Sequence, residues 1–177
     1  MKKLKSTWYN MAIVLTTIAV VAGAALGYVN SITAPIIEDL KAKQEKDAEL
    51  EVLNGQEGTA IKVSDPKGFG GTLTVMVGLA PDGTILGYKV LESKETPGLG
   101  AKAKDWFQQG QKGNIIGKKA GNLAVTKDKD GDVDAITAST ITSRAFLRCI
   151  NAAYKTLSES SADGQSGASK QANDNNI

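Results

Sequence analysis

The chain has 177 residues, of which 41% are hydrophobic and 23% charged, and its formal net charge is +2. That charge is small and no basic cluster alternates with aromatic residues, so no nucleic acid is expected as a partner. The sequence contains no histidine and one cysteine, Cys149. The usual general base, the commonest metal ligand and an internal disulfide are therefore excluded, and neither a metal site nor a catalytic residue is predicted.

The N-terminal region contains an uncharged apolar stretch, Met11–Val29. As a helix, roughly 20 such residues span about 30 Å, which is the thickness of a hydrocarbon core. We therefore predict a transmembrane helix at residues 10–30, after a short N-terminus at residues 1–9. The alternatives are a signal peptide cleaved near Ala22-Gly23-Ala24 and a buried core helix.

The charges on either side of this stretch predict its orientation. Lys2, Lys3 and Lys5 precede it, and the first charges after it are Glu38 and Asp39. Basic flanks stay in the cytoplasm, so residues 1–9 are expected to be cytoplasmic. The chain is then a single-pass protein of the cell (inner) membrane, in contact with the lipid bilayer. The rest of it lies on the periplasmic or extracellular face.

A stalk helix is predicted at residues 31–56, between the membrane and the outer part of the chain. Pro35 suits the first turn of a new helix. Ile36–Leu53 carries a partly apolar face among many charges, with Ile36, Ile37, Leu40, Leu50 and Leu53 as its apolar positions. Asn54-Gly55 is expected to end the helix.

The outer part begins with a predicted hairpin. Thr72–Leu79 and Ile85–Leu91 have high strand propensity and flank the turn Pro81-Asp82-Gly83. A short helix is predicted at Lys102–Gln109, with Trp106 and Phe107 on its inner side.

A second hairpin and a long helix follow. Leu123–Thr126 and Val133–Ile136 flank the segment Lys127–Asp132, which we interpret as a turn, since its glycine is misplaced for an EF-hand and no glutamate follows at the twelfth position. Thr142–Leu157 is predicted to be helical, with one apolar face formed by Phe146, Cys149, Ile150, Ala153 and Leu157. Residues 158–177 have almost nothing to bury and are predicted to be disordered. Strands followed by helices indicate an α+β fold with an antiparallel sheet.

Two segments have compositions suited to binding a ligand. Asp134–Ser143 places five hydroxyl side chains and two alanines between a strand and a helix. This pattern is typical of an ordinary helix cap, and the alternative is a phosphate site made of backbone amides and hydroxyls. Glu95–Gly100 reads Glu-Thr-Pro-Gly-Leu-Gly, either a plain surface loop or a turn that holds Leu99 against a flat aromatic ligand.

The two segments together, behind a single span, resemble the FMN-binding domain of the G subunit of the Rnf electron-transport complex. A related domain occurs in the C subunit of the sodium-pumping NADH:quinone oxidoreductase. The resemblance extends over nearly the whole chain, including Gly68-Phe69-Gly70-Gly71. In the family, the fourth residue of Ser/Thr-Gly-Ala-Ser/Thr-x-Ser/Thr is esterified to the FMN phosphate.

The resemblance implies which residues bind the cofactor. Thr140 takes the position of the flavinylated residue, and Asp134 that of an acidic residue upstream. Ala138 and Ser139 stand where Gly-Ala is commonest, which makes Ser139 the nearest rival for the attachment, and Ala138 lacks the freedom of glycine at positive φ. The cofactor-binding residues implied are Glu95, Thr96, Pro97, Gly98, Leu99, Gly100, Thr137, Ala138, Ser139, Ile141 and Thr142.

The resemblance also implies a function. Residues 57–157 would form an FMN-binding domain that passes electrons within a ferredoxin:NAD⁺ oxidoreductase coupled to ion translocation, without being catalytic alone. The implied partners are the other membrane subunits of the complex and a flavin transferase that uses FAD. The alternatives are the C subunit of the quinone reductase, which is usually longer, and a membrane-anchored binding domain without flavin.

Overall fold

The computed structural model describes residues 8–128 and 131–168, with residues 161–168 described by their backbone alone. The chain divides into two compact units, residues 1–43 and 44–177, and each is described by itself. The elements are α1 (Trp8–Leu53), β1 (Thr59–Asp65), β2 (Leu73–Leu79), β3 (Ile85–Glu92), a 3-10 turn η1 (Gly100–Lys102), α2 (Ala103–Trp106) and α3 (Thr140–Ala168).

The first unit contains the N-terminal part of α1. This part is long and apolar enough to cross a membrane, and none of its most apolar stretch is buried, in contrast to a core helix. Hydroxyl side chains within it bond to carbonyls of the same helix, as in Thr16 to Ala12 and Thr17 to Ile13, both at 2.8 Å. Polar groups in lipid must be satisfied in this way. An apolar N-terminal helix of this kind indicates membrane anchoring.

Pro35 does not begin a new helix as predicted but lies inside α1, which continues through it to Leu53. Proline has no N–H and cannot donate to the carbonyl of Ser31, four residues earlier. The loss of one hydrogen bond does not end the helix, because the turns on both sides keep theirs. The lysines on which the predicted orientation depends lie outside the described residues.

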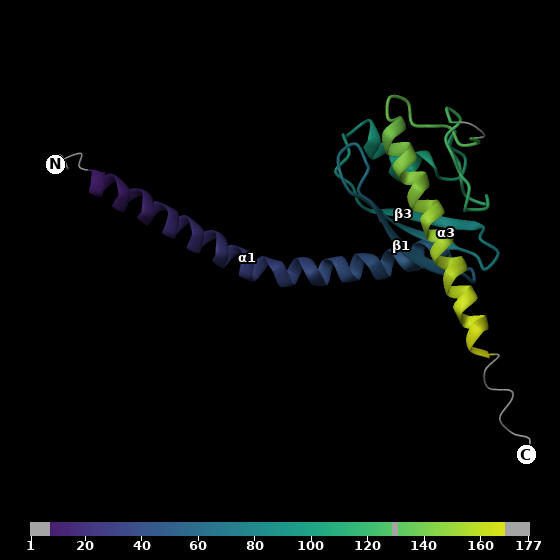
Figure 1. Ribbon diagram of the computed structural model, residues 1–177, viewed down its shortest axis with the longest axis horizontal. Coiled ribbons are helices and arrows are strands. Elements are labelled where there is room, and N and C mark those ends of the chain that lie inside the picture. The colour runs from purple at the N-terminus through teal and green to yellow at the C-terminus, as the bar shows by residue number, and fades with distance from the viewer. Residues whose placement is uncertain (1–7, 129–130, 169–177) are drawn as a thin grey trace, which may run out of the picture. The chain divides into compact units, whose positions relative to one another are not determined.

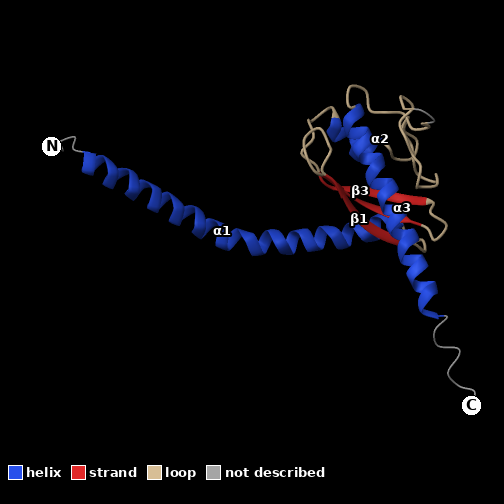
Figure 2. Ribbon diagram, viewed as in Figure 1, coloured by secondary structure: helices blue, strands red, loops and turns tan. Residues whose placement is uncertain are grey.

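The second unit is built on a three-stranded antiparallel sheet in the order β1-β2-β3. The predicted hairpin is confirmed as β2 and β3, joined through Gly83, whose φ is +81°. β1 was not predicted as a strand, although Ile61 and Val63 alternate with Lys62 and Ser64 along it. The strands and helices together confirm the α+β class (Figure 2).

One face of the sheet is covered by α3, which crosses the strands in Figure 1. β2 contributes Leu73, Val75, Val77 and Leu79 to this core. The predicted apolar face of α3 is confirmed, since all its members are buried: Phe146, Cys149, Ile150, Ala153 and Leu157. Burial raises the pKa of the Cys149 thiol to about 12, which makes this cysteine an unreactive core residue.

The last turns of α1 cover the opposite face of the sheet. Here Ala48 and Val52 are buried with Met76 of β2. The sequence predicted Leu50 as part of the apolar face, but Leu50 is 74% exposed. The side of α1 that faces the sheet is set by Val52, whose backbone lies against Gly78 and Gly87, a pair of register partners in β2 and β3. A Cβ on Gly78 would lie 2.3 Å from the Val52 carbonyl oxygen.

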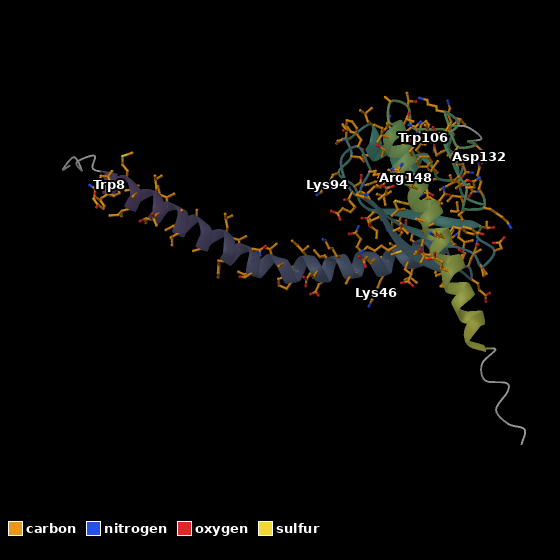
Figure 3. All side chains as sticks on the ribbon, viewed as in Figure 1. Trp8, Lys46, Lys94, Trp106, Asp132 and Arg148 are labelled. Atoms are coloured by element: carbon orange, nitrogen blue, oxygen red, sulfur yellow. The ribbon has the colours of Figure 1, made fainter. Side chains whose placement is uncertain are left out.

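The second predicted hairpin is wrong. Val125 and Val133 meet in an isolated parallel bridge rather than in a ladder of strands. Side chains from other elements form hydrogen bonds with the backbone groups next to this bridge. Asn151 accepts from the N–H of Leu123 and donates to its carbonyl, and Trp106 Nε1 donates to the carbonyl of Asp134. Trp106 lies close to α3 in Figure 3. The predicted inner position of Phe107 is confirmed, because it is fully buried.

α3 is longer at both ends than the predicted Thr142–Leu157. Residues 158–168, which the sequence predicted to be disordered, continue the helix. Extending an existing helix costs little, because each added residue gains a hydrogen bond without a new nucleus. Residues 169–177 of the predicted tail lie outside the described residues.

Candidate functional site

The first turn of α3 is held by the side chain of Ser143. The N–H of Ser143 donates to the carbonyl of Ser139 at 3.0 Å, and its hydroxyl donates to the same carbonyl at 2.9 Å. The hydroxyl of Ser143 also accepts from the N–H of Ile136 at 2.9 Å. Ser139 therefore acts as the N-cap and the helix begins at Thr140, two residues before the predicted start.

A chain of buried hydroxyls leads from this turn to a carboxylate. Ser139 Oγ donates to Thr142 Oγ1, and Thr142 Oγ1 donates to Glu95 Oε2, each at 2.8 Å. Ser139 and Glu95 are each 8% exposed and Thr142 is fully buried. The protein itself thus uses the hydroxyls of Ser139 and Thr142, and a ligand would have to displace these bonds to reach them.

Glycines allow Glu95 to lie this deep. The N–H of Gly70 donates to Glu95 Oε1 at 3.2 Å. A Cβ on Gly68 would lie 2.7 Å from Oε1, and one on Gly100 would lie 2.4 Å from Oε2. No side chain larger than hydrogen fits at either position without movement. Glu95 therefore joins three segments that are distant in sequence: the glycine loop 68–71, the turn 95–100 and the start of α3.

Thr140 differs from the buried Ser139 and Thr142 because it is only half-buried. Lys127 Nζ donates to Thr140 Oγ1 at 3.3 Å. Within the described part of the chain, the backbone N–H groups of Thr140, Ile141 and Thr142 have no hydrogen-bond acceptor. The first amides of a helix carry a partial positive charge and bind anions, phosphate above all.

A pocket of about 350 Å³ lies over this turn. Its volume is within the range of roughly 300–1,000 Å³ that is typical of small-molecule sites. Three apolar side chains at the pocket are exposed: Phe69 at 70%, Ile141 at 52% and Leu99 at 42%. The remaining lining residues are Glu95, Thr96, Gly100, Ala138, Ser139, Thr140 and Thr142. The pocket thus combines the start of a helix, a geometry that can bind phosphate, with exposed apolar side chains that suit a flat ring.

The pocket brings together most of the residues that the sequence singled out. Pro97, Gly98 and Thr137 are exposed and are not among its lining residues. Two residues were not predicted as site residues: Phe69, which was noted only within the segment Gly68-Phe69-Gly70-Gly71, and Lys127, which was interpreted as part of a turn. An aromatic residue between glycines is the signal that could have identified Phe69. For Lys127 no sequence signal exists, because its contact with Thr140 depends on the fold.

The turn before α3 carries backbone strain at Ala138. Its φ is +60°, in the left-handed region that favours glycine. For a residue with a Cβ this conformation costs about 1–2 kcal/mol. The turn keeps it nonetheless, because the N–H of Ser139 donates to the carbonyl of Ile136 across it at 3.0 Å. The strained residue lines the pocket directly beside Ser139 and Thr140.

Comparison with known proteins agrees with this geometry. The family model described as the FMN-binding domain matches residues 68–155, which include the glycine loop, Glu95–Gly100 and the start of α3. The G subunit of the Na(+)-translocating ferredoxin:NAD(+) oxidoreductase complex of Acetobacterium woodii is 31% identical, over 89% of this chain and 98% of its own length.

Two further relatives carry similar names. The G subunit of the ion-translocating oxidoreductase complex of Vibrio atlanticus is 34% identical, over 73% of this chain and 64% of that protein. The G subunit of the proton-translocating ferredoxin:NAD(+) oxidoreductase complex of Clostridium ljungdahlii is 38% identical, over 52% of this chain and 49% of that protein. With its pocket and its apolar N-terminal helix, the chain belongs to the family of FMN-binding-domain proteins that includes the G subunits of ion-translocating oxidoreductase complexes.

Proposed function

We propose that this chain is a membrane-anchored flavoprotein subunit that carries FMN on Thr140 as a phosphoester. It passes electrons within an Rnf-type ferredoxin:NAD⁺ oxidoreductase complex coupled to ion translocation, and is not catalytic alone. The observation that carries the proposal is the contrast among the hydroxyls of one turn. Ser139 and Thr142 are buried and bonded internally, whereas Thr140 is only half-buried and lies beside helix amides that have no acceptor among the described residues.

The residues of the pocket fit FMN. The amides of Thr140, Ile141 and Thr142 are available to hydrogen-bond the phosphate oxygens, and Lys127 adds a positive charge. Phe69 and Leu99 offer exposed apolar surface to the ring system. The flavin supplies the redox chemistry, and the protein supplies position and electrostatics. No proton-transfer residue is needed to pass single electrons, which suits a chain without histidine.

A covalent bond has a physical advantage at the proposed location. We place the domain on the periplasmic or extracellular face, because Lys2, Lys3 and Lys5 precede the apolar part of α1. A cofactor lost on that face would not be replaced from the cytoplasmic pool. A reporter fused to the C-terminus tests this orientation, since a reporter active only in the cytoplasm would contradict it.

The relatives' names give the proposed setting. One is described as Na(+)-translocating and another as proton-translocating, and both as belonging to ferredoxin:NAD(+) oxidoreductase complexes. We infer that the present chain joins other membrane subunits of such a complex and is matured by a flavin transferase.

The proposal is tested on the full chain, coexpressed with a flavin transferase and purified from membranes. We expect the intact mass of the denatured protein to exceed that of the bare chain by one FMN minus one water. The flavin absorption should bleach with dithionite and return in air. A protein that binds no flavin under these conditions, while a known substrate of the same transferase is modified, would refute the proposal.

A further inference from the structure

The ammonium group of Lys127 is held beside the oxygen that would carry the flavin. Lys127 follows Val125, which meets Val133 in a bridge just before the hydroxyl-rich turn. From there Nζ reaches across to Thr140 and donates to its Oγ1 at 3.3 Å. The contact joins residues 13 positions apart, so the fold and not the local sequence creates it.

The two described carboxylates nearest to Lys127 in sequence are bonded elsewhere. Asp128 is held by Arg144, whose Nε donates to Oδ2 at 2.9 Å, and this hydrogen bond holds the pKa of Asp128 below its ordinary value. Asp132 is paired with Lys118 at 2.8 Å. Among the described residues no carboxylate forms an ion pair with Lys127, so its described polar partner is the neutral Thr140 hydroxyl.

We propose that Lys127 is a positioning residue for flavin attachment: its ammonium binds the phosphate that becomes esterified to Thr140. This inference rests on the proposed function and assigns a role within the same site. A cation beside the acceptor oxygen attracts the incoming phosphate. Together with the unpaired amides at the start of α3, it presents donors that need no rearrangement during the reaction.

The attachment step balances without a redox change. Thr140 Oγ1 attacks the phosphorus of the FMN half of FAD and forms the new P–O bond. The pyrophosphate P–O bond breaks and AMP leaves with its electron pair. The hydroxyl proton of Thr140 passes to a base of the transferase. Because Lys127 is the donor in its bond to Thr140 Oγ1, the hydroxyl proton of Thr140 is not used in that bond and can be removed by the base. Negative charge that develops on the phosphate then lies next to the Lys127 ammonium.

The test compares variants of the full chain in detergent, with purified transferase and FAD, by the rate at which the intact mass gains the flavin. Lys127→Met keeps a side chain of similar length but removes its charge. We expect attachment to be about tenfold slower in this variant. A preorganised donor strongly stabilises a developing anion, but solvent screening of an exposed charge limits the effect. Lys127→Arg should restore the rate to within about twofold, because it keeps the positive charge. Lys127→Glu should be slower than Lys127→Met.

Lys155→Met is the matched control. Lys155 lies on the same helix as Thr140, and its side chain is 77% exposed. At 1.5 Å per residue it is about 22 Å from Thr140, so its removal should leave the rate unchanged. Raising NaCl from about 0.05 M to about 0.5 M should narrow the gap between the wild type and Lys127→Met, since salt screens exposed charges. A purely structural role would not give this salt dependence or rescue by arginine.

The outcomes separate this inference from the proposed function. If the wild type is flavinylated and Lys127→Met reacts as fast as Lys155→Met, Lys127 has no such role, while the proposed function stands. A slow Lys127→Met that arginine does not rescue and salt does not affect would also overturn the inference. Absence of flavin on the wild type would instead refute the proposed function.

Discussion

Glycines permit a close approach in two regions of the second unit, and the regions use it differently. On the α1 side of the sheet, Gly78 and Gly87 let the backbone of Val52 lie against the strands. The result is a closed contact in which Val52 is 1% exposed and Met76 is 6% exposed. In this region the close approach serves packing, and the charged side chains beside it are paired with each other, Lys62 with Glu45 and Lys89 with Glu51.

At the pocket, Gly68 and Gly100 play the same geometric part around Glu95. Here the approach buries a carboxylate that accepts from Gly70 and Thr142. Because the internal hydroxyls bond to one another and to Glu95, Thr140 and the helix amides remain available at the surface. The comparison shows that a buried polar network fixes the turn beneath the pocket, while the donors that the network does not use lie at the pocket.

The largest expected effect is a loss of stability in the first region. Gly78→Ala would place a Cβ 2.3 Å from the Val52 carbonyl oxygen, between two backbone segments that cannot easily move. We expect the free energy of unfolding of the second unit to fall by about 3 kcal/mol, as for severe overpacking. Chemical denaturation of the full chain in detergent, followed by Trp106 fluorescence in a Trp8→Phe background, measures it.

The matched control for this substitution is Gly27→Ala on α1, where an added Cβ has no described atom within 4 Å. It should leave the unfolding of the second unit unchanged. Flavin attachment to the folded Gly78→Ala protein should proceed at the wild-type rate. If it slowed in proportion to the lost stability, the two regions would not be separate in function.

The next effect concerns Glu95. Glu95→Ala leaves the hydroxyl of Thr142 and the N–H of Gly70 without their acceptor, and we expect a destabilisation of about 2 kcal/mol. Flavin attachment should also slow in the folded protein, because the turn is no longer held. Glu92→Ala, at an exposed position, should change stability by less than about 0.5 kcal/mol. Wild-type attachment in Glu95→Ala would show that the buried network does not organise the site.

The smallest effect has the opposite sign. Ala138 adopts a φ of +60°, so Ala138→Gly removes the steric cost of its Cβ. Set against the greater chain entropy of glycine, the net gain should be about 0.5–1 kcal/mol in the free energy of unfolding. Thermal unfolding of the full chain should show a higher midpoint. An unchanged or lower midpoint would mean that the turn is not strained as its φ indicates.

Local patterns predicted the parts of the fold that depend on local chemistry. The strand propensity of Thr72–Leu79 and Ile85–Leu91, with Asp82-Gly83 between them, was sufficient for β2 and β3. β1 was missed because it is half-exposed and carries a weaker apolar signal. The prediction of the second hairpin was wrong because Asn151 and Trp106, both distant in sequence, hydrogen-bond the backbone groups that would otherwise pair the two strands.

For the site, the sequence supplied the candidates but not their arrangement. The resemblance singled out Thr140 and Ser139 as rivals, and only the structure distinguishes their surroundings. The bond between Thr142 and Glu95 spans 47 positions, and no periodicity encodes such a contact. The start of α3 at Thr140 likewise depends on how Ser143 bonds Ser139 and Ile136. Three-dimensional contacts therefore determine which hydroxyl remains accessible.

The central claim is that Thr140 carries the flavin, and mapping the attachment on the full chain tests it most directly. After coexpression with the transferase and proteolysis, fragmentation mass spectrometry should locate the FMN on Thr140 in the wild type and in Ser139→Ala. Thr140→Ala should carry none. Flavin located on Ser139, or retained by Thr140→Ala, would contradict the account.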